Sequence, residues 1–113
     1  MEKGYTITEM VKDAHANAAE KGFWDEYPHP ATCIALMHSE LSEALEKMRE
    51  GAFPHEATTD FNTGKPIGVG IELADTVIRI ADFCGAYGIN LEQRILEKME
   101  YNKGRERLHG KLF

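Results

Sequence analysis

The sequence has little of several features that mark familiar classes of protein. Only two cysteines, Cys33 and Cys84, occur among the 113 residues, both within apolar stretches. They lack the short spacing of a metal motif, so we expect two reduced core residues and no disulfide framework. No apolar run approaches the roughly 20 residues that cross a bilayer, and the first residues lack the apolar core of a signal peptide. These absences predict a soluble, cytoplasmic protein without a membrane partner.

Positive charge is also scarce. Thirteen Lys and Arg against nineteen Asp and Glu give a net charge of −6 with neutral histidines. A chain of this charge repels a phosphate backbone, so we expect no binding to polymeric nucleic acid. A small phosphorylated ligand is still compatible, because a divalent metal ion can reverse the local sign. The other residues have an ordinary globular composition, and the length predicts a single domain over residues 1–113.

Apolar residues recur at helical spacing in four segments, and no segment alternates cleanly as a strand would. We expect helices at about residues 7–21, 31–51, 69–86 and 91–103. Thr6 with Glu9 and Asn90 with Gln93 have the spacing of capping boxes, and Gly22 is a stop signal for the first helix. The buried arc of the second helix is expected to comprise Ile34, Met37, Leu41, Ala44, Leu45 and Met48. The sequence therefore predicts an all-α, four-helix bundle-like fold.

Residues 51–68 connect the second and third predicted helices and show no usable periodicity. The segment contains two prolines and three glycines. A structureless connection of about 18 residues is uncommon within a compact domain. It is interpreted either as a lid or binding loop or as a mobile surface connection, and the sequence favours neither.

Four carboxylates give the strongest indication of chemistry. Glu40 and Glu43 on the second predicted helix, and Glu72 and Asp75 on the third, form pairs three residues apart. Each pair therefore lies on one helical face, at the border of an apolar arc. If the two arcs pack as antiparallel neighbours, the carboxylates meet at one seam, where their repulsion favours a cation between them. Oxygen ligands of this kind suit Mg²⁺ or Mn²⁺.

Two other interpretations fit carboxylates in this pattern. Taken singly, each is more simply a solvated residue at the edge of an amphipathic helix. A di-iron bundle also uses inward carboxylates, but it requires Glu-x-x-His pairs. Here Glu43 and Asp75 occupy the positions where those histidines would stand. We therefore do not expect a di-iron site.

In this order the motifs resemble those of the MazG-like nucleotide pyrophosphohydrolases, the all-α NTP-pyrophosphatase superfamily. The resemblance rests on residues 38–46, 70–79 and 98–110, and it extends over most of the chain. It implies Mg²⁺-dependent hydrolysis of a (deoxy)nucleoside triphosphate between its α and β phosphates, giving the monophosphate and pyrophosphate. It also implies a homodimer or homotetramer whose sites are completed near a subunit interface.

The resemblance assigns roles to particular residues. Glu40, Glu43, Glu72 and Asp75 would hold the metal. Glu43 and Glu72 are the candidate catalytic carboxylates, and one of the four, with Glu43 favoured, could act as general base instead of as a pure ligand. The sequence does not determine which of them is the base. The residues that would face the phosphates are Lys98, Asn102 and Arg105, with Arg107 as an alternative to Arg105. Serines stand where some relatives have a further acidic residue, which leaves the number of metal ions open.

Three residues of the first helix and the following turn are candidates for a nucleobase pocket. His15 and Asn17 could hydrogen-bond a base, and Trp24 could stack on one. The alternative for Trp24 is a core anchor that holds the turn after it. The alternative for His15 is a partly exposed helical residue without a ligand.

Two non-catalytic functions compete with hydrolysis. A helical interaction module would carry no chemistry, and Glu72 and Asp75 would then tolerate Gln and Asn. A nucleotide-sensing domain would be stabilised by metal but would release no pyrophosphate. The sequence leaves open which nucleotide is bound.

Overall fold

A computed structural model describes residues 4–112, except for the side chain of His109. Over this range the chain forms four α-helices, α1 (Ile7–Glu20), α2 (Pro30–Arg49), α3 (Val69–Tyr87) and α4 (Leu91–Lys103). It also forms two short strands, β1 (Thr58–Thr59) and β2 (Pro66–Ile67), and a 3-10 helix η1 (Arg107–Gly110). The predicted all-α, four-helix fold is confirmed. Within the described range each helix is too short or too polar to cross a bilayer.

The helix ends follow local signals in the sequence. The Thr6 side chain accepts a hydrogen bond from the Glu9 amide at 3.0 Å, and the Glu9 side chain accepts one from the Thr6 amide, so the capping box is complete. Asn90 accepts from the Gln93 amide at 3.1 Å, but the Gln93 side chain donates along α4 instead of returning to the cap. Gly22 follows α1 with φ of 89°, a conformation that glycine adopts without a steric cost.

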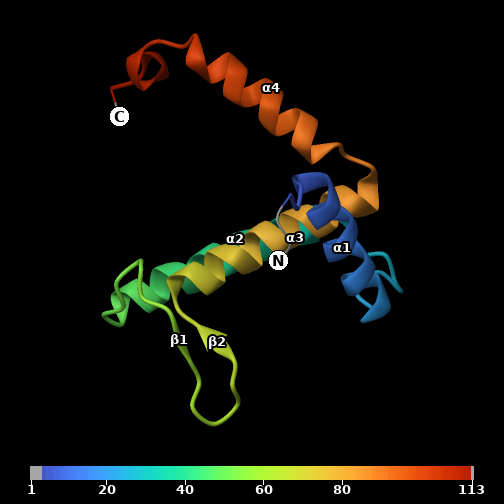
Figure 1. Ribbon diagram of the computed structural model, residues 1–113, viewed down its shortest axis with the longest axis vertical. Helices are drawn as coiled ribbons and strands as arrows, with labels where there is room; N and C mark the ends of the chain where they lie inside the picture. The colour runs from blue at the N-terminus through green and yellow to red at the C-terminus, as the bar shows by residue number, and fades with distance from the viewer. Residues whose placement is uncertain (1–3, 113) are drawn as a thin grey trace.

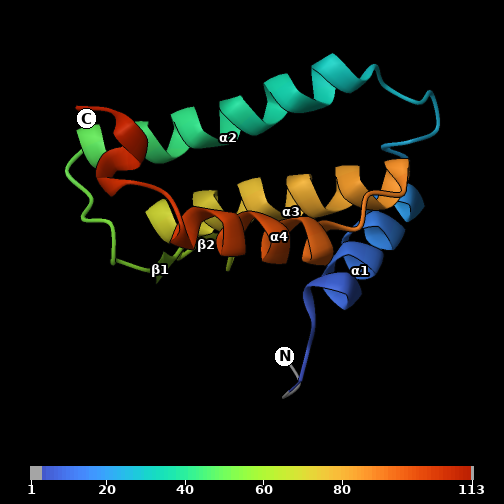
Figure 2. The same cartoon turned by 90° about the horizontal axis from the view of Figure 1, so that it is seen from above.

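The helices α2 and α3 lie side by side and run antiparallel (Figures 1 and 2). Helix α1 packs against the C-terminal part of α3, at the end away from the two strands (Figure 2). Helix α4 contacts α1 near its start, where the Thr8 amide donates to Glu92 at 3.3 Å. From there α4 leads away from the α2–α3 pair (Figure 1).

The core of the described chain is small. Its buried apolar residues are Trp24, Cys33, Ala44, Val69, Ala81 and Cys84. Both cysteines are free and buried, as expected. Gly85 allows the close approach of α1 to α3, because a Cβ at this position would lie 2.5 Å from the His15 Cβ.

Much apolar surface on α2, α3 and α4 is left exposed. The exposed fraction is 43–58% for Ile34, Leu41, Leu45, Met48, Leu73, Val77, Ile78, Leu96 and Met99. Of the arc of α2 that was expected to be buried, only Ala44 is fully buried. The expectation fails within one chain because α1 covers only part of α3 and α4 points away. An uncovered apolar face of this extent is typical of an interaction surface.

The segment 51–68 is not structureless, contrary to expectation. It forms a two-stranded antiparallel hairpin that pairs Thr58 with Ile67 and Thr59 with Pro66. Asp60 closes the turn by accepting hydrogen bonds from the amides of Asn62 and Thr63, both at 2.9 Å, and these bonds lower the pKa of its carboxyl. Strands of two residues are too short to show the alternation that identifies a strand in a sequence.

Replacing Gly85 with alanine tests the α1–α3 contact. We expect the free energy of unfolding to fall by about 1–3 kcal/mol, because the added methyl group forces the two helices apart. Gly70→Ala in the same helix is the matched control, since a Cβ there meets no atom within 4 Å. The control should leave stability unchanged or raise it by up to about 1 kcal/mol. Urea denaturation measures both, and equal stability of the two variants would contradict the close contact.

Candidate metal centre

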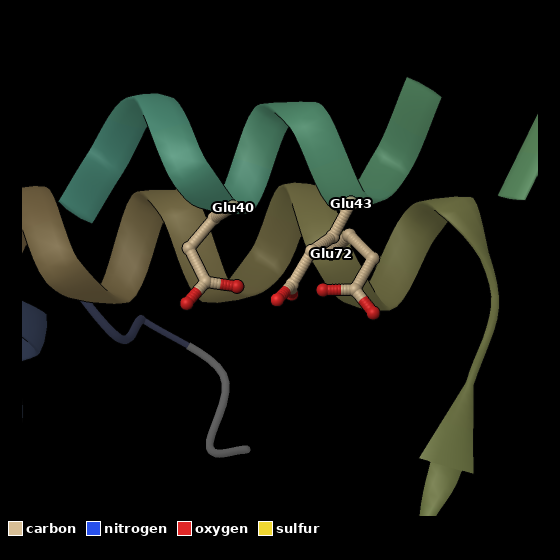
Figure 3. Close-up of side chains that lie close together, drawn as sticks. All are labelled: Glu40, Glu43 and Glu72. Carbon is tan, nitrogen blue, oxygen red and sulfur yellow. The ribbon is translucent and has the colours of Figure 1, made fainter. Parts of the chain in front are cut away.

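Three carboxylates meet at the seam between α2 and α3. Glu40 and Glu43 from α2 and Glu72 from α3 each offer an oxygen atom, and the three oxygens lie within 4.8 Å of one another. Figure 3 shows the side chains facing the same side of the helix pair. The spacing of three residues places the two α2 side chains on one face, and the antiparallel packing places Glu72 beside them. The result is a set of hard oxygen ligands suited to a divalent cation.

The surroundings of Glu72 raise the pKa of its carboxyl. Partial burial raises it above its ordinary value, and a hydrogen bond with Glu43 adds to the rise. The negative charges of Glu43, Asp75 and Glu40 raise it further. A cation among the oxygens would reverse the electrostatic part of this effect.

Asp75 lies beside the three-carboxylate group but does not belong to it. It follows Glu72 by one turn on the same face of α3 and lines an open hollow that also reaches Glu40. The structure therefore brings together three of the four predicted metal ligands and places the fourth next to them.

Glu40 also has a partner of opposite charge. The Nε atom of Arg79 donates to Glu40 Oε1 at 2.8 Å, and Glu40 is only 9% exposed. Arg79 is not among the site residues predicted from the sequence. The signal that could have identified it is its position one helical turn after Asp75, on the same face of α3.

The hollow beside the carboxylates lies between α1, α2 and α3 and has a volume of about 340 Å³. Its lining is charged or polar on one part and apolar on another, and it comprises Ala14, Asn17, Ala18, Lys21, Phe23, Glu40, Asp75, Ile78, Arg79 and Asp82. Of the three residues predicted to contact a nucleobase, Asn17 is the one in this lining. Such a mixed, concave surface is suited to a small polar ligand with an apolar part.

The other two base candidates, His15 and Trp24, converge on Asp82. The indole Nε1 of Trp24 donates to Asp82 Oδ1 at 2.8 Å, and His15 Nδ1 lies 2.9 Å from the same oxygen. Trp24 and Asp82 are both buried, so Trp24 is a core anchor, which was the alternative to base stacking. The side chain of His15 is 31% exposed and can still meet a ligand. Sequence analysis did not foresee the role of Asp82, which joins α1, the following turn and α3.

The predicted phosphate ligands lie on α4 and just beyond it, away from the carboxylates. The Lys98 ammonium and the Arg105 guanidinium lie 4.9 Å and 5.7 Å from the centre of the Tyr101 ring. The Oδ1 atom of Asn102 is buried and receives no hydrogen bond from the described residues. Because α4 leads away from α2 and α3 (Figure 1), one chain alone does not bring these side chains to Glu40, Glu43 and Glu72.

Comparison with known proteins identified no relative: no family model, curated protein or solved structure matches the chain.

Replacing Glu72 with glutamine should stabilise the metal-free protein at pH 7. A raised pKa in the folded state means that folding disfavours the charged carboxylate. The contribution of Glu72 to stability is thus complete below its ordinary pKa of 4.5 and is lost as the pH rises through the higher folded value. The amide carries no charge and avoids this loss.

Urea denaturation in the presence of a chelator measures this difference. We expect a clear gain for Glu72→Gln at pH 7 and a much smaller one at pH 4. Glu46→Gln, at an exposed position of α2, should show no such pH dependence. A Glu72→Gln variant less stable than the original at pH 7 would mean that Glu72 makes a stabilising contact that the amide cannot replace.

Proposed function

We propose that the protein is a Mg²⁺-dependent nucleoside triphosphate pyrophosphohydrolase, which cleaves its substrate between the α and β phosphates. The observation that carries this proposal is the approach of Glu40, Glu43 and Glu72 to within 4.8 Å. The resemblance of the Glu-x-x-Glu and Glu-x-x-Asp motifs to those of MazG-like enzymes supports the same chemistry. Mn²⁺ could occupy the same ligands.

The carboxylates have distinct parts in this proposal. Glu40, Glu43 and Glu72 would hold the metal, and Asp75 would contribute from the adjoining turn. When bound, Mg²⁺ supplies charge stabilisation at the phosphoryl oxygens and orients the phosphates. Glu43, which is exposed, would take the proton of the attacking water as general base, with Glu72 as the second catalytic carboxylate.

The hollow between α1, α2 and α3 is the proposed nucleotide site. Its volume of about 340 Å³ is within the range of small-molecule sites. Phe23 and Ile78 provide apolar surface, and Asn17 provides hydrogen-bonding groups for a base or sugar. His15 and Trp24 would shape this region through Asp82, which also lines it.

We propose further that the active form is a homodimer or homotetramer, in which a second copy brings Lys98, Asn102 and Arg105 to the carboxylates. The exposed apolar faces of α2, α3 and α4 support this assembly, since they are uncovered in the single chain. The buried Oδ1 of Asn102, which receives no hydrogen bond from the side chains and backbone that the structure describes, supports it as well. A cytoplasmic location is part of the same proposal, because the buried cysteines are free and the substrate is a free nucleotide.

A nucleotide-sensing or helical interaction module is the second candidate. The observation that favours it is the same exposed apolar surface, which would bind a partner whether or not the carboxylates act chemically. The two functions differ in whether pyrophosphate is released.

Pyrophosphate release from a panel of canonical and modified (deoxy)nucleoside triphosphates tests the hydrolase directly. With Mg²⁺, we expect turnover of at least one member, and Glu72→Gln or a chelator should reduce it by about 100-fold or more. Glu46→Gln should retain full turnover. Mg²⁺ should also raise the melting temperature, because a ligand of the native state stabilises it.

If the folded protein releases pyrophosphate from no nucleotide, the hydrolase proposal is wrong. A Mg²⁺-dependent rise in melting temperature would then favour the sensor, and the absence of such a rise would favour the interaction module.

Mixing two inactive variants tests whether a second copy completes the site. Lys98→Gln and Glu72→Gln should each abolish most turnover when pure. Co-refolded in equal amounts, they should regain about a quarter of the original turnover, because half of the dimers are mixed and each has one intact site. Lys103→Gln, at an exposed position of the same helix, should behave as the unmodified protein. If the mixture stays inactive, Lys98 does not act across an interface.

A further inference from the structure

Arg79 meets the carboxylate group directly. Its Nε atom donates to Glu40 Oε1 at 2.8 Å, across the seam between α3 and α2. The Arg79 side chain is 35% exposed, whereas the side chain of Glu40 is 12% exposed. The ion pair is thus shielded on the side of Glu40 and open on the side of Arg79.

The bond to Glu40 uses only one of the N–H donors of Arg79. A guanidinium has five N–H donors, and the bond to Glu40 uses the one on Nε. Among the described residues, the two terminal nitrogens have no hydrogen-bond acceptor. A planar pair of such nitrogens matches two oxygens of a phosphate group. Neutralising Glu40 alone would require only a point charge, which a lysine supplies.

Arg79 lines the hollow of about 340 Å³. Glu40 and Asp75 line it too, and Lys21 adds a second cation at its wall. A phosphate there would lie near the guanidinium and near Glu40, one of the carboxylates that are proposed to hold Mg²⁺. The positive charges of Arg79 and Lys21 would offset the acidic character of the site, which otherwise repels an anion.

We propose that Arg79 binds a phosphate group of the substrate through its terminal nitrogens while its Nε holds Glu40 in position. The identity of the substrate as a nucleoside triphosphate rests on the proposed function. Phosphate recognition would then be divided between Arg79, on the same chain as the carboxylates, and the α4 side chains of a second copy.

Calorimetric titration of the protein with inorganic triphosphate in the presence of Mg²⁺ tests this role without a nucleotide. Arg79→Gln should weaken binding by about tenfold or more, and Arg79→Lys by a smaller but measurable factor, since lysine keeps the charge without the planar fork. The matched control is Arg94→Gln on α4. It removes an exposed arginine that is also paired 2.8 Å from a carboxylate, that of Glu97, and it should bind within about twofold of the original.

Melting curves separate a binding role from a structural one. If Arg79 only supports the fold, Arg79→Gln will melt at a lower temperature and Arg79→Lys will bind triphosphate as the original does, which would overturn the proposal. Should Arg79→Gln fail to fold, the affinity of Arg79→Lys decides alone. Absence of triphosphate binding by the unmodified protein would overturn the proposal as well.

Pyrophosphate release distinguishes failure of this proposal from failure of the proposed function. If the protein hydrolyses a nucleotide and both Arg79 variants retain kcat and KM, the role of Arg79 is wrong and the hydrolase stands. If no nucleotide is hydrolysed but triphosphate binding requires Arg79, the hydrolase is wrong and the anion site stands.

Discussion

The antiparallel contact between α2 and α3 is the constraint on which the rest of the structure depends. It buries Ala44 and Val69, and the same contact brings Glu40 and Glu43 against Glu72. A fold shaped by stability alone would keep three carboxylates further apart, because partial burial and mutual repulsion disfavour their charged forms. Functional sites commonly depart from local optima in this way. A cation bound among the three carboxylates, as proposed, would offset this repulsion.

One face of α3 carries several of the polar contacts that join the helices. Along it, Glu72 faces the carboxylate group, Asp75 lines the hollow, Arg79 binds Glu40, and Asp82 accepts hydrogen bonds from two residues outside the helix. The face begins at the proposed metal ligands and ends in the buried network around Asp82. Metal, phosphate and nucleotide sites would consequently share a single rigid support, which favours a fixed geometry among them.

The core is small in part because α4 does not pack against α2 and α3. A helix that leads away from its neighbours exposes Leu96 and Met99 and leaves the apolar faces of α2 and α3 uncovered. The exposed apolar surface would contribute stability only once it is covered, so assembly and stability would be linked. In the proposed oligomer the same association that covers these faces would deliver the cations of α4. Binding and assembly would then depend on one interface.

Local chemistry in the sequence determined the helices and the pairing of carboxylates within each helix. Capping by Thr6 and Asn90 depends on residues three positions away, and a spacing of three residues fixes a shared face. The tertiary structure alone decided which side chains meet across helices. The ion pair of Arg79 with Glu40 and the burial of Trp24 against α3 depend on how helices cross and which rotamers then fit. The direction of α4 and the presence of the two-residue strands could not be predicted from the sequence either, because too few residues determine each of them. What the sequence determined is local and periodic, whereas the site depends on contacts between residues 29 and more positions apart in the chain, such as Glu43 and Glu72.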